Sequence, residues 1–401
     1  MEEIDKPKTV VLGVTGGIAC YKAVELVRLL VKGSHRVQVI MTRGAMEFVT
    51  PLTFQTLTGH PVATEIFSLT QESEIGHINL ADSADLLVIA PATANIIGKI
   101  ANGIADDLLT TVIMATQAPV LIAPAMNIHM FENPIVQENL RKLRRVGYHV
   151  LDPAEGFLAC GYEGKGRLPD PEKIADEVER LLAKKDLAGE RLLITAGPNR
   201  ESLDPVRYLS NRSSGKMGYA LARAAVRRGA EVVLVSGPTA IDCPFGVRMI
   251  AVTTAAEMRD AVVKEFATAT AVVMAAAVAD YRPVVTADRK IKRGKGPIEL
   301  RLEPNPDIVK ELGQNKDGKM LIGFAAETED LTANAAKKLR EKNLDMIVAN
   351  NVAEAGSGFD GDTNIATIID RTGAAQPLPL MTKDELADHI FDHFLALKGQ
   401  R

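Results

Sequence analysis

The chain is 401 residues long, beyond the roughly 250–300 residues at which a single hydrophobic core stops growing, and this length predicts two domains. A net charge of -4, 4% aromatic residues and no tryptophan argue against a nucleic-acid-binding protein, because such proteins need a basic surplus or aromatic stacking platforms. No apolar run approaches the roughly 18 residues of a membrane helix, and the acidic start is unlike a signal peptide, so we expect a cytoplasmic protein without a membrane partner.

The three cysteines lie far apart in the sequence. Cys20, Cys160 and Cys243 show no CxxC or CxxH spacing, which argues against both a disulfide framework and a structural zinc site. A free thiol with a chemical role is still compatible with this pattern. The basic run at 141–145 is interpreted as a solvated helix face.

Nearly continuous apolar runs in the first half are typical of buried parallel strands. They cover residues 10–14, 36–42, 84–92 and 118–125, and helical patterns such as 21–32 and 106–116 separate them. This alternation predicts an α/β fold with a doubly wound sheet, of the flavodoxin-like or Rossmann-like kind.

A polar stretch at 184–190 follows a helical pattern, and the alternation then restarts. We therefore predict two domains, residues 1–185 and 186–401. In the second, strands are expected at 191–196, 230–237, 269–280, 319–328, 344–350 and 366–370, and helices at 219–229, 254–267, 331–343 and 383–397. The second half is thus predicted to be a Rossmann-like nucleotide-binding domain.

Ligands of an open parallel sheet bind beyond the carboxyl ends of its strands, so the residues that follow each strand are candidate site residues. In the first half these are a Gly/Thr turn at 13–17, Thr42, the segment PATAN at 91–95 and the segment PAMNIHM at 124–130. Their hydroxyls, amides and bare backbone suit a phosphate and a polar ring system. GVTGGIA is not GxGxxG, and no acidic residue is placed to hold an adenosine ribose, which disfavours NAD.

The first half resembles the flavin-dependent cysteine decarboxylases through the segments GHINLAD, APATANIIGKIANGIADDLLTT and APAMNIHM, which occur in order. The resemblance implies bound FMN, with His77 as the catalytic base and Asn127 meeting the substrate carboxylate. The residues implied to bind FMN are Gly16, Gly17, Thr42, Pro91, Ala92, Thr93 and Asn95. A lone histidine is otherwise a structural hydrogen-bonder, and we interpret His35, His60, His149, His389 and His393 in that way.

The segment ACGYEGKGR resembles the flexible flap of this family, in which Cys160 takes part in the last reduction. In the family, the flavin oxidises the thiol of the substrate so that the electrons left by departing CO₂ have an acceptor. The alternative for Cys160 is a small buried side chain. We interpret Cys20 and Cys243 as structural residues. Phe131 stands where the family often has tryptophan.

The second half resembles phosphopantothenate-cysteine ligase through DPVRYLSNRSSGKMG, AAAVADYRP, KIKR, EPNPDI, GFAAETED and LDMIVANN. Both halves together, in this order, resemble the bacterial bifunctional phosphopantothenoylcysteine decarboxylase/phosphopantothenate-cysteine ligases of coenzyme A biosynthesis. The segment SNRSSGKMG is not a P-loop, yet its hydroxyls and amides before a helix can hold phosphate. By itself KIKR is typical of a solvated charge run.

The resemblance implies that CTP converts 4'-phosphopantothenate to an acyl cytidylate, from which the amine of L-cysteine displaces CMP. Asn211 is implied to help the acyl intermediate react, and Lys290 to neutralise the triphosphate. The residues implied to bind CTP are Ser213, Ser214, Gly215, Asp280, Lys290, Asn305, Asp307, Phe324, Lys338 and Lys342. Mg²⁺ or Mn²⁺ is expected with the triphosphate, held by ligands that the sequence leaves unknown. The family's first turn usually reads GPT or GGT, whereas here it reads GPN with Asn199.

The partners implied are 4'-phosphopantothenate, L-cysteine and CTP, with no nucleic acid. The family also implies a homo-oligomer, with trimers of the decarboxylase half, dimers of the ligase half and a dodecamer as one way to combine them. Two other classes stay open: a flavin-binding regulatory protein without turnover, and a nicotinamide oxidoreductase. His77, Asn127 and Cys160 argue against the first, and the missing GxGxxG against the second.

Overall fold

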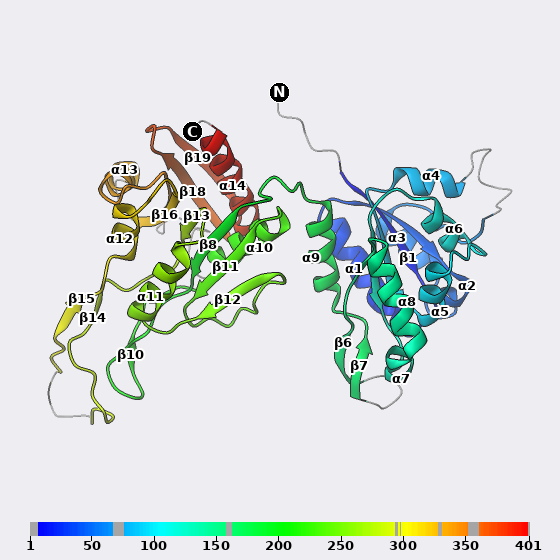
Figure 1. Ribbon diagram of the computed structural model, residues 1–401, viewed down its shortest axis with the longest axis horizontal. Coiled ribbons are helices and arrows are strands. Elements are labelled where there is room, and N and C mark those ends of the chain that lie inside the picture. Colours follow the sequence, from blue (N-terminus) through cyan, green and yellow to red (C-terminus); the bar gives the residue numbers. More distant parts are fainter. Residues whose placement is uncertain are drawn as a thin grey trace. The chain divides into compact units, whose positions relative to one another are not determined.

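The computed structural model describes residues 7–66, 76–157, 163–292, 296, 298–327, 331–351 and 361–399. It divides into two compact α/β units, Met1–Ala183 and Lys184–Arg401 (Figure 1). Across these described ranges, none of the helices combines the length and the apolar composition that a membrane span requires. Each unit is built around its own sheet, as the alternating pattern of the sequence predicts.

The sheet of the first unit has five strands in the order β2-β1-β3-β4-β5. Their bounds are Thr9–Val14 for β1, Arg36–Met41 for β2, Leu86–Ala92 for β3, Val120–Pro124 for β4 and His149–Val150 for β5. All neighbours are parallel. The chain order reverses beside β1, and the carboxyl ends of the strands at such a reversal form the usual ligand crevice.

Helices cover both faces of this sheet and bury a core on each. They are α1 (Cys20–Lys32), α2 (Arg43–Met46), α3 (Pro51–Thr58), α4 (Gly76–Ser83), α5 (Ala94–Ala101), α6 (Leu108–Ala115), α7 (Ile128–Glu132), α8 (Pro134–Arg145) and α9 (Pro171–Leu182). An antiparallel hairpin of β6 (Ala154–Phe157) and β7 (Glu163–Arg167) precedes α9. The basic run at 141–145 lies at the end of α8, as a solvated helix face requires.

The sheet of the second unit has eight strands in the order β12-β11-β8-β13-β16-β17-β18-β19. Their bounds are Arg191–Ala196 (β8), Glu231–Ser236 (β11), Val247–Ala251 (β12), Ala271–Met274 (β13), Met320–Glu327 (β16), Met346–Asn351 (β17), Thr363–Asp370 (β18) and Ala375–Thr382 (β19). The strands from β12 to β17 are parallel, and β18 and β19 are antiparallel additions. The helices are α10 (Lys216–Arg227), α11 (Ala255–Phe266), α12 (Ile308–Gln314), α13 (Leu331–Glu341) and α14 (Lys383–Gly399).

Two small hairpins extend away from this sheet (Figure 1). We call them the arm, which consists of residues 201–209 and the described residues of 281–304. One pairs β9 (Glu201–Ser202) with β10 (Tyr208–Leu209), and the other pairs β14 (Tyr281–Pro283) with β15 (Leu302–Pro304).

The strand predicted at 269–280 is too long, because only Ala271–Met274 form strand β13. Strand β13 ends at Met274, and the alanine-rich segment that follows leaves the sheet. The reason is that other loops satisfy its backbone: Ala277 N donates to Gly197 O at 3.0 Å, and Ala277 O accepts from the Asn211 amide at 3.3 Å. An apolar run cannot reveal this loss of strand pairing.

The edge strand β19 carries two prolines, Pro377 and Pro379. Proline has no N–H to donate to a ladder and is therefore confined largely to edge strands. The opposite edge of the sheet, β12, has no proline and is largely exposed.

Two candidate functional sites

A cavity of about 1360 Å³ lies at the carboxyl ends of β1 to β4 in the first unit. Its walls include Gly16, Gly17, Thr42, Pro91, Thr93, Asn95 and Asn127, all of which the sequence marks as candidates. Ala92 is fully buried in β3 and is not among the lining residues. The parallel order of the strands brings these distant segments together.

Bare backbone forms one corner of the cavity. A Cβ added to Gly16 would lie 2.7 Å from the carbonyl carbon of Gly44, so the loops after β1 and β2 meet backbone to backbone. Gly17 O accepts from Cys20 N at 2.9 Å as α1 begins. The Gly16–Gly17 turn therefore lies directly before α1, beside a cradle that only glycine leaves open, and a glycine turn at a helix N-terminus is a usual place for a phosphate in α/β proteins.

Thr15 ties the ends of β1 and β3 together beneath the cavity. Its Oγ1 donates to Pro91 O at 2.7 Å and accepts from Thr93 N at 3.2 Å. Its carbonyl oxygen accepts from Cys20 Sγ at 2.9 Å, and burial raises the pKa of this thiol. A buried thiol with a raised pKa is a poor nucleophile, which agrees with a structural role for Cys20.

The cavity also has a charged wall that sequence reasoning missed. Lys99 Nζ lies 2.6 Å from Asp106 Oδ1 and 3.1 Å from Asp107 Oδ2, and all three residues line the cavity. The hydrogen bond to Asp106 raises the pKa of Lys99. Burial of Asp107 is outweighed by hydrogen bonds from Thr110 and Lys99, which lower its pKa. The only signal in the sequence was the spacing GKIANGIADD, which brings these charges together only if α5 and α6 are joined by a tight turn.

The hairpin of β6 and β7 docks against the loop that carries Asn127. Met126 N donates to Gly166 O at 2.9 Å, and Asn127 Oδ1 accepts from His129 N at 2.8 Å. Gly164 and Gly166 have φ values of +156° and +155°, and a Cβ on them would clash with Ile128 and with Met126 O. Cys160, the predicted flap cysteine, lies outside the described residues.

His77 is the second residue of helix α4 and lines a second, smaller cavity of about 240 Å³. That cavity also contains His60, and it shares Glu65, Ile66 and Leu108 with the large one. His77 itself is not a lining residue of the large cavity. In one chain, therefore, the predicted base and Asn127 lie in neighbouring cavities rather than in one.

The second candidate site lies at the carboxyl ends of β8 and β13 in the second unit. Gly215 caps α10 with φ +81°, and a Cβ there would lie 2.7 Å from Thr239 Cγ2 and 3.4 Å from Gly197 Cα. Ser213 Oγ accepts from Gly215 N at 3.3 Å, and Ser214 lies between them in the chain. These residues form a close-packed turn before the helix, as the segment SNRSSGKMG predicts.

Three predicted residues meet around the segment that follows β13. Asn211 Nδ2 donates to Val278 O at 3.0 Å, and Asn305 Nδ2 donates to Ala279 O at 2.9 Å. Asn305 N also donates to Asp280 O at 2.8 Å, and the Asp280 side chain is exposed. Asn305 Oδ1 is buried with no hydrogen-bond partner among the described residues.

A predicted cation and a predicted carboxylate also meet in this unit. Asp307 caps α12 by accepting from Lys310 N at 3.1 Å, and it pairs with Lys342 Nζ at 3.1 Å. Lys338 lies on α13, one turn before Lys342. Phe324 on β16 is half-buried against the core.

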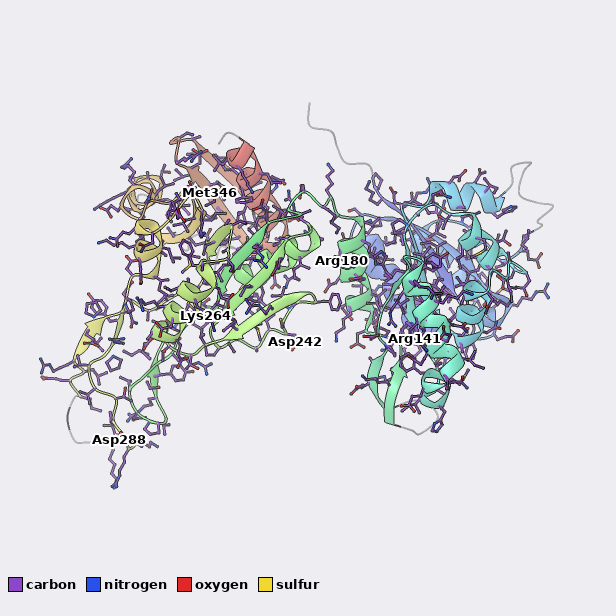
Figure 2. The ribbon with its side chains drawn as sticks, viewed as in Figure 1. Arg141, Arg180, Asp242, Lys264, Asp288 and Met346 are labelled. Atoms are coloured by element: carbon purple, nitrogen blue, oxygen red, sulfur yellow. The ribbon has the colours of Figure 1, made fainter. Side chains whose placement is uncertain are left out.

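Lys290 lies apart from these residues on the arm. It is exposed between β14 and β15, and Asp288, two residues earlier, lies near the far end of the arm (Figure 2). The backbone beside it is anchored, because Ile291 N donates to Asp204 Oδ2 at 3.0 Å and Ile291 O accepts from Arg207 at 2.7 Å. Hydrogen bonds from Arg207 hold the pKa of Asp204 below its usual range, against the opposing effect of burial.

No group of three or more His, Cys, Asp or Glu side chains suited to a metal ion occurs within the part of the chain that the structure describes. The geometry defines a two-unit α/β protein. One unit has a large cavity at the carboxyl ends of its parallel strands, with glycines at one corner. The other has a close-packed glycine turn between a strand and a helix, which is a usual place for a nucleotide.

The family models agree with this class. The Flavoprotein family matches residues 1–183, and the DNA/pantothenate metabolism flavoprotein C-terminal domain matches residues 187–397. Similar relatives are the coenzyme A biosynthesis bifunctional proteins CoaBC of Bacillus subtilis (50% identical, covering 98% of both chains) and Vibrio cholerae (48%, covering 96% of both).

Similar solved structures include the C-terminal domain of a CoaBC protein, 44% identical with a TM-score of 0.48. It covers 54% of this chain and 100% of that chain. Another is the FMN-dependent cysteine decarboxylase SpaF, 30% identical with a TM-score of 0.39, covering 44% and 99%. The chain belongs to the CoaBC family of bifunctional coenzyme A biosynthesis enzymes, with a decarboxylase domain and a ligase domain.

Proposed function

We propose that residues 186–401 use CTP to join 4'-phosphopantothenate to L-cysteine through an acyl cytidylate. Residues 1–185 then use FMN to decarboxylate the product, which becomes 4'-phosphopantetheine. The observation that carries the flavin assignment is the large cavity at four strand ends, with its bare corner at Gly16 and Gly44. The match of both family models to one chain supports the pairing of the two reactions.

The cavity fits FMN in size and in chemistry. Its volume of about 1360 Å³ exceeds the range of roughly 300–1,000 Å³ usual for small-molecule sites, which leaves room for a substrate beside the ring. The turn at Gly16 and Gly17 suits the phosphate, and Thr42, Thr93 and Asn95 offer polar contacts to the rest of the cofactor. When bound, the flavin supplies the two-electron oxidation and reduction that decarboxylation needs.

Asn127 in this cavity binds the substrate carboxylate, and His77 in the neighbouring smaller cavity is the catalytic base. The docking of the β6–β7 hairpin beside Asn127 supports a role for the segment between these strands, including Cys160, in the final reduction. The ammonium group of Lys99 lines the cavity and contacts the bound ligand, and its ion pairs with Asp106 and Asp107 fix its position.

In the ligase site, Asn211 and Asp280 act beside the reacting carboxyl group and the nucleotide, because both belong to the cluster around Ala277–Asp280. The turn at Ser213, Ser214 and Gly215 holds phosphate. Lys290, Lys338 and Lys342 supply positive charge to the triphosphate, whose oxygens also hold Mg²⁺ or Mn²⁺. Asn305, Asp307 and Phe324 shape the nucleotide pocket.

A homo-oligomer accompanies both activities, with dimers of the ligase domain. The arm supports this, because it exposes apolar side chains to a degree unusual for a monomer surface. Val206, Tyr208, Tyr281, Val284, Val285, Ile298, Leu300 and Leu302 are all at least 44% exposed. The decarboxylase domain is proposed to form a trimer, and its exposed apolar residues include Ile18, Tyr21, Phe48 and Leu52.

The decisive experiment incubates the purified chain with 4'-phosphopantothenate, L-cysteine and CTP. The expected products are 4'-phosphopantetheine, CO₂, CMP and pyrophosphate in equal amounts, and omission of cysteine should abolish CO₂. A chain that purifies yellow yet forms none of these products would be the flavin-binding regulator. A colourless chain that neither binds added FMN nor releases CO₂ contradicts the flavin assignment.

A further inference from the structure

The turn after β8 contains a buried asparagine that the proposed function does not use. Asn199 is fully buried. Its Oδ1 accepts from Ala279 N at 2.6 Å, and its Nδ2 donates to Glu201 Oε1. Glu201 is only 5% exposed, and the same Oε1 accepts from Ala255 N, the first residue of α11, at 2.8 Å.

These contacts complete a clamp on one short segment, Ala277–Asp280. The Asn211 amide donates to the carbonyl oxygens of Ala277 and Val278, and the Asn305 amide donates to that of Ala279. Asn199 contributes the acceptor, because its Oδ1 receives the N–H of Ala279. Three asparagines from three separate segments thus fix a stretch of four residues that has left the sheet.

The three clamp members differ in burial. Asn199 has no exposed surface, whereas Asn211 is exposed and Asn305 is half-buried. Asn199 therefore reaches no ligand directly, and its effect on one passes through Ala279 to the adjacent Asp280. An apolar side chain in place of this amide would leave Ala279 N unpaired and would take from Glu201 Oε1 one of its two donors, the other being Ala255 N.

We propose that Asn199 is a positioning residue for the ligase reaction, which sets the place of Asp280 through its bond to Ala279 and is itself oriented by Glu201. The inference rests on the proposed CTP-dependent function. The Asn199 amide bridges two groups. Because its nitrogen donates to the buried Glu201 carboxylate, its oxygen points toward the Ala277–Asp280 segment and accepts from Ala279 N.

The first test is Asn199→Leu, a side chain of similar size without hydrogen bonds. CTP-dependent pyrophosphate release by the full chain should show a KM for CTP raised at least tenfold. Decarboxylation of supplied 4'-phosphopantothenoylcysteine, measured on the same preparation, should be unchanged because it belongs to the other unit. Asn364→Ala is the control: Asn364 is 3% exposed on β18 and accepts from Ile365 N, outside the clamp.

The second test separates positioning from simple folding support. In Asn199→Asp the oxygen that replaces Nδ2 cannot donate to Glu201 unless the acid pair holds a proton. Its KM for CTP should therefore be high at neutral pH and fall toward the wild-type value as pH is lowered, with wild type measured alongside. Asn199→Thr keeps a hydroxyl that can donate to Glu201 or accept from Ala279 N, and it should lie between wild type and Asn199→Leu.

The outcomes are distinct. If the wild-type chain releases no pyrophosphate from CTP with 4'-phosphopantothenate, the proposed function fails. If wild type is active and Asn199→Leu binds CTP normally, the positioning role is wrong. Should Asn199→Leu not fold, the pH series decides: a KM for Asn199→Asp that follows wild type at every pH overturns the inference.

Discussion

At the scale of single residues, polar side chains hold the backbone where strands end. Thr15 does so in the first unit by joining Pro91 and Thr93, and Asn199 and Asn211 do so in the second by holding Ala277–Asp280. Loops that carry sites have few apolar contacts of their own, so such bonds decide where a neighbouring catalytic group lies.

The assignment of His77 as catalytic base gives the first prediction. His77→Asn should keep its flavin, because His77 does not line the large cavity, yet lose decarboxylation by the roughly 10²- to 10⁴-fold typical of a removed acid or base. His60→Asn is the matched control, since His60 lines the same smaller cavity. CO₂ release and visible absorbance measure both effects. Equal rates for the two variants would remove His77 from the mechanism.

The anchor of the arm predicts a pH dependence of stability. Hydrogen bonds from Arg207 lower the pKa of Asp204 below its ordinary value of 3.8, so the folded state binds this proton less readily than the unfolded chain. Its contribution to stability is full above pH 3.8 and is lost as pH falls through the folded pKa. The urea midpoint of Asp204→Asn, followed for the ligase unit, should lie below that of wild type by a constant amount above pH 5, and this difference should shrink below pH 3.8. A gap that widens in acid would contradict the sign of the shift.

Residues at strand ends were the most predictable part of the lining of the large cavity. Gly16, Thr42 and Asn95 follow strands that the apolar runs reveal, and parallel strands bring their carboxyl ends to one edge. Lys99 was missed because its carboxylate partners are seven and eight residues away, across a turn that no periodic pattern describes. Asn199 was noted only as a departure from the usual GPT turn, since burial cannot be inferred for a polar residue in a glycine-rich turn.

At the scale of elements, the β6–β7 hairpin tests how the flap is placed. Gly166→Ala introduces a Cβ against Met126 O at φ +155°, so the hairpin must move away from Asn127. CO₂ release should continue, while the last reduction slows and the oxidised enethiol product accumulates. Mass spectrometry of the products measures the ratio of the two forms.

Gly147→Ala is the control for this substitution. Gly147 also has a positive φ, +96°, but no atom within 4 Å of an added Cβ. It shares the backbone strain without the clash. Similar product ratios in both variants would show that the docking of the hairpin is irrelevant to the reduction.

Strands that are continuous apolar runs in the sequence were predicted at the right positions, whereas short or exposed strands were missed. The apolar runs of β1, β3, β8 and β17 mark buried strands, and the strands lie there. Strand β12 has an exposed pattern and was missed. The hairpins β9–β10 and β14–β15 are two or three residues per strand, too short for alternation to be visible.

At the scale of the whole molecule, each unit has its own cores. Two clusters lie within residues 10–182 and two within residues 187–397. Domains with separate cores can unfold as separate cooperative systems, and a ligand stabilises the domain that binds it. Calorimetry of the full chain should therefore show two transitions, with FMN raising one midpoint and CTP the other.

The same division predicts an active fragment. Residues 186–401 alone should form 4'-phosphopantothenoylcysteine without flavin and prefer CTP over ATP. Asp186 supports this start point, because Arg228 pairs with it at 2.7 Å and so fixes the chain before β8. A fragment that folds but makes no product, beside an active full chain, would place part of the ligase site in the first unit.

The prolines of β19 have a consequence for behaviour at high concentration. An exposed strand offers a row of unpaired N–H and C=O groups on which another chain can extend the sheet, and this is how many proteins begin to polymerise. Pro377 and Pro379 interrupt the donor row at one edge of the eight-stranded sheet. The edge at β12 has no such interruption, so growth of a fibre from this sheet would be one-ended and would start there.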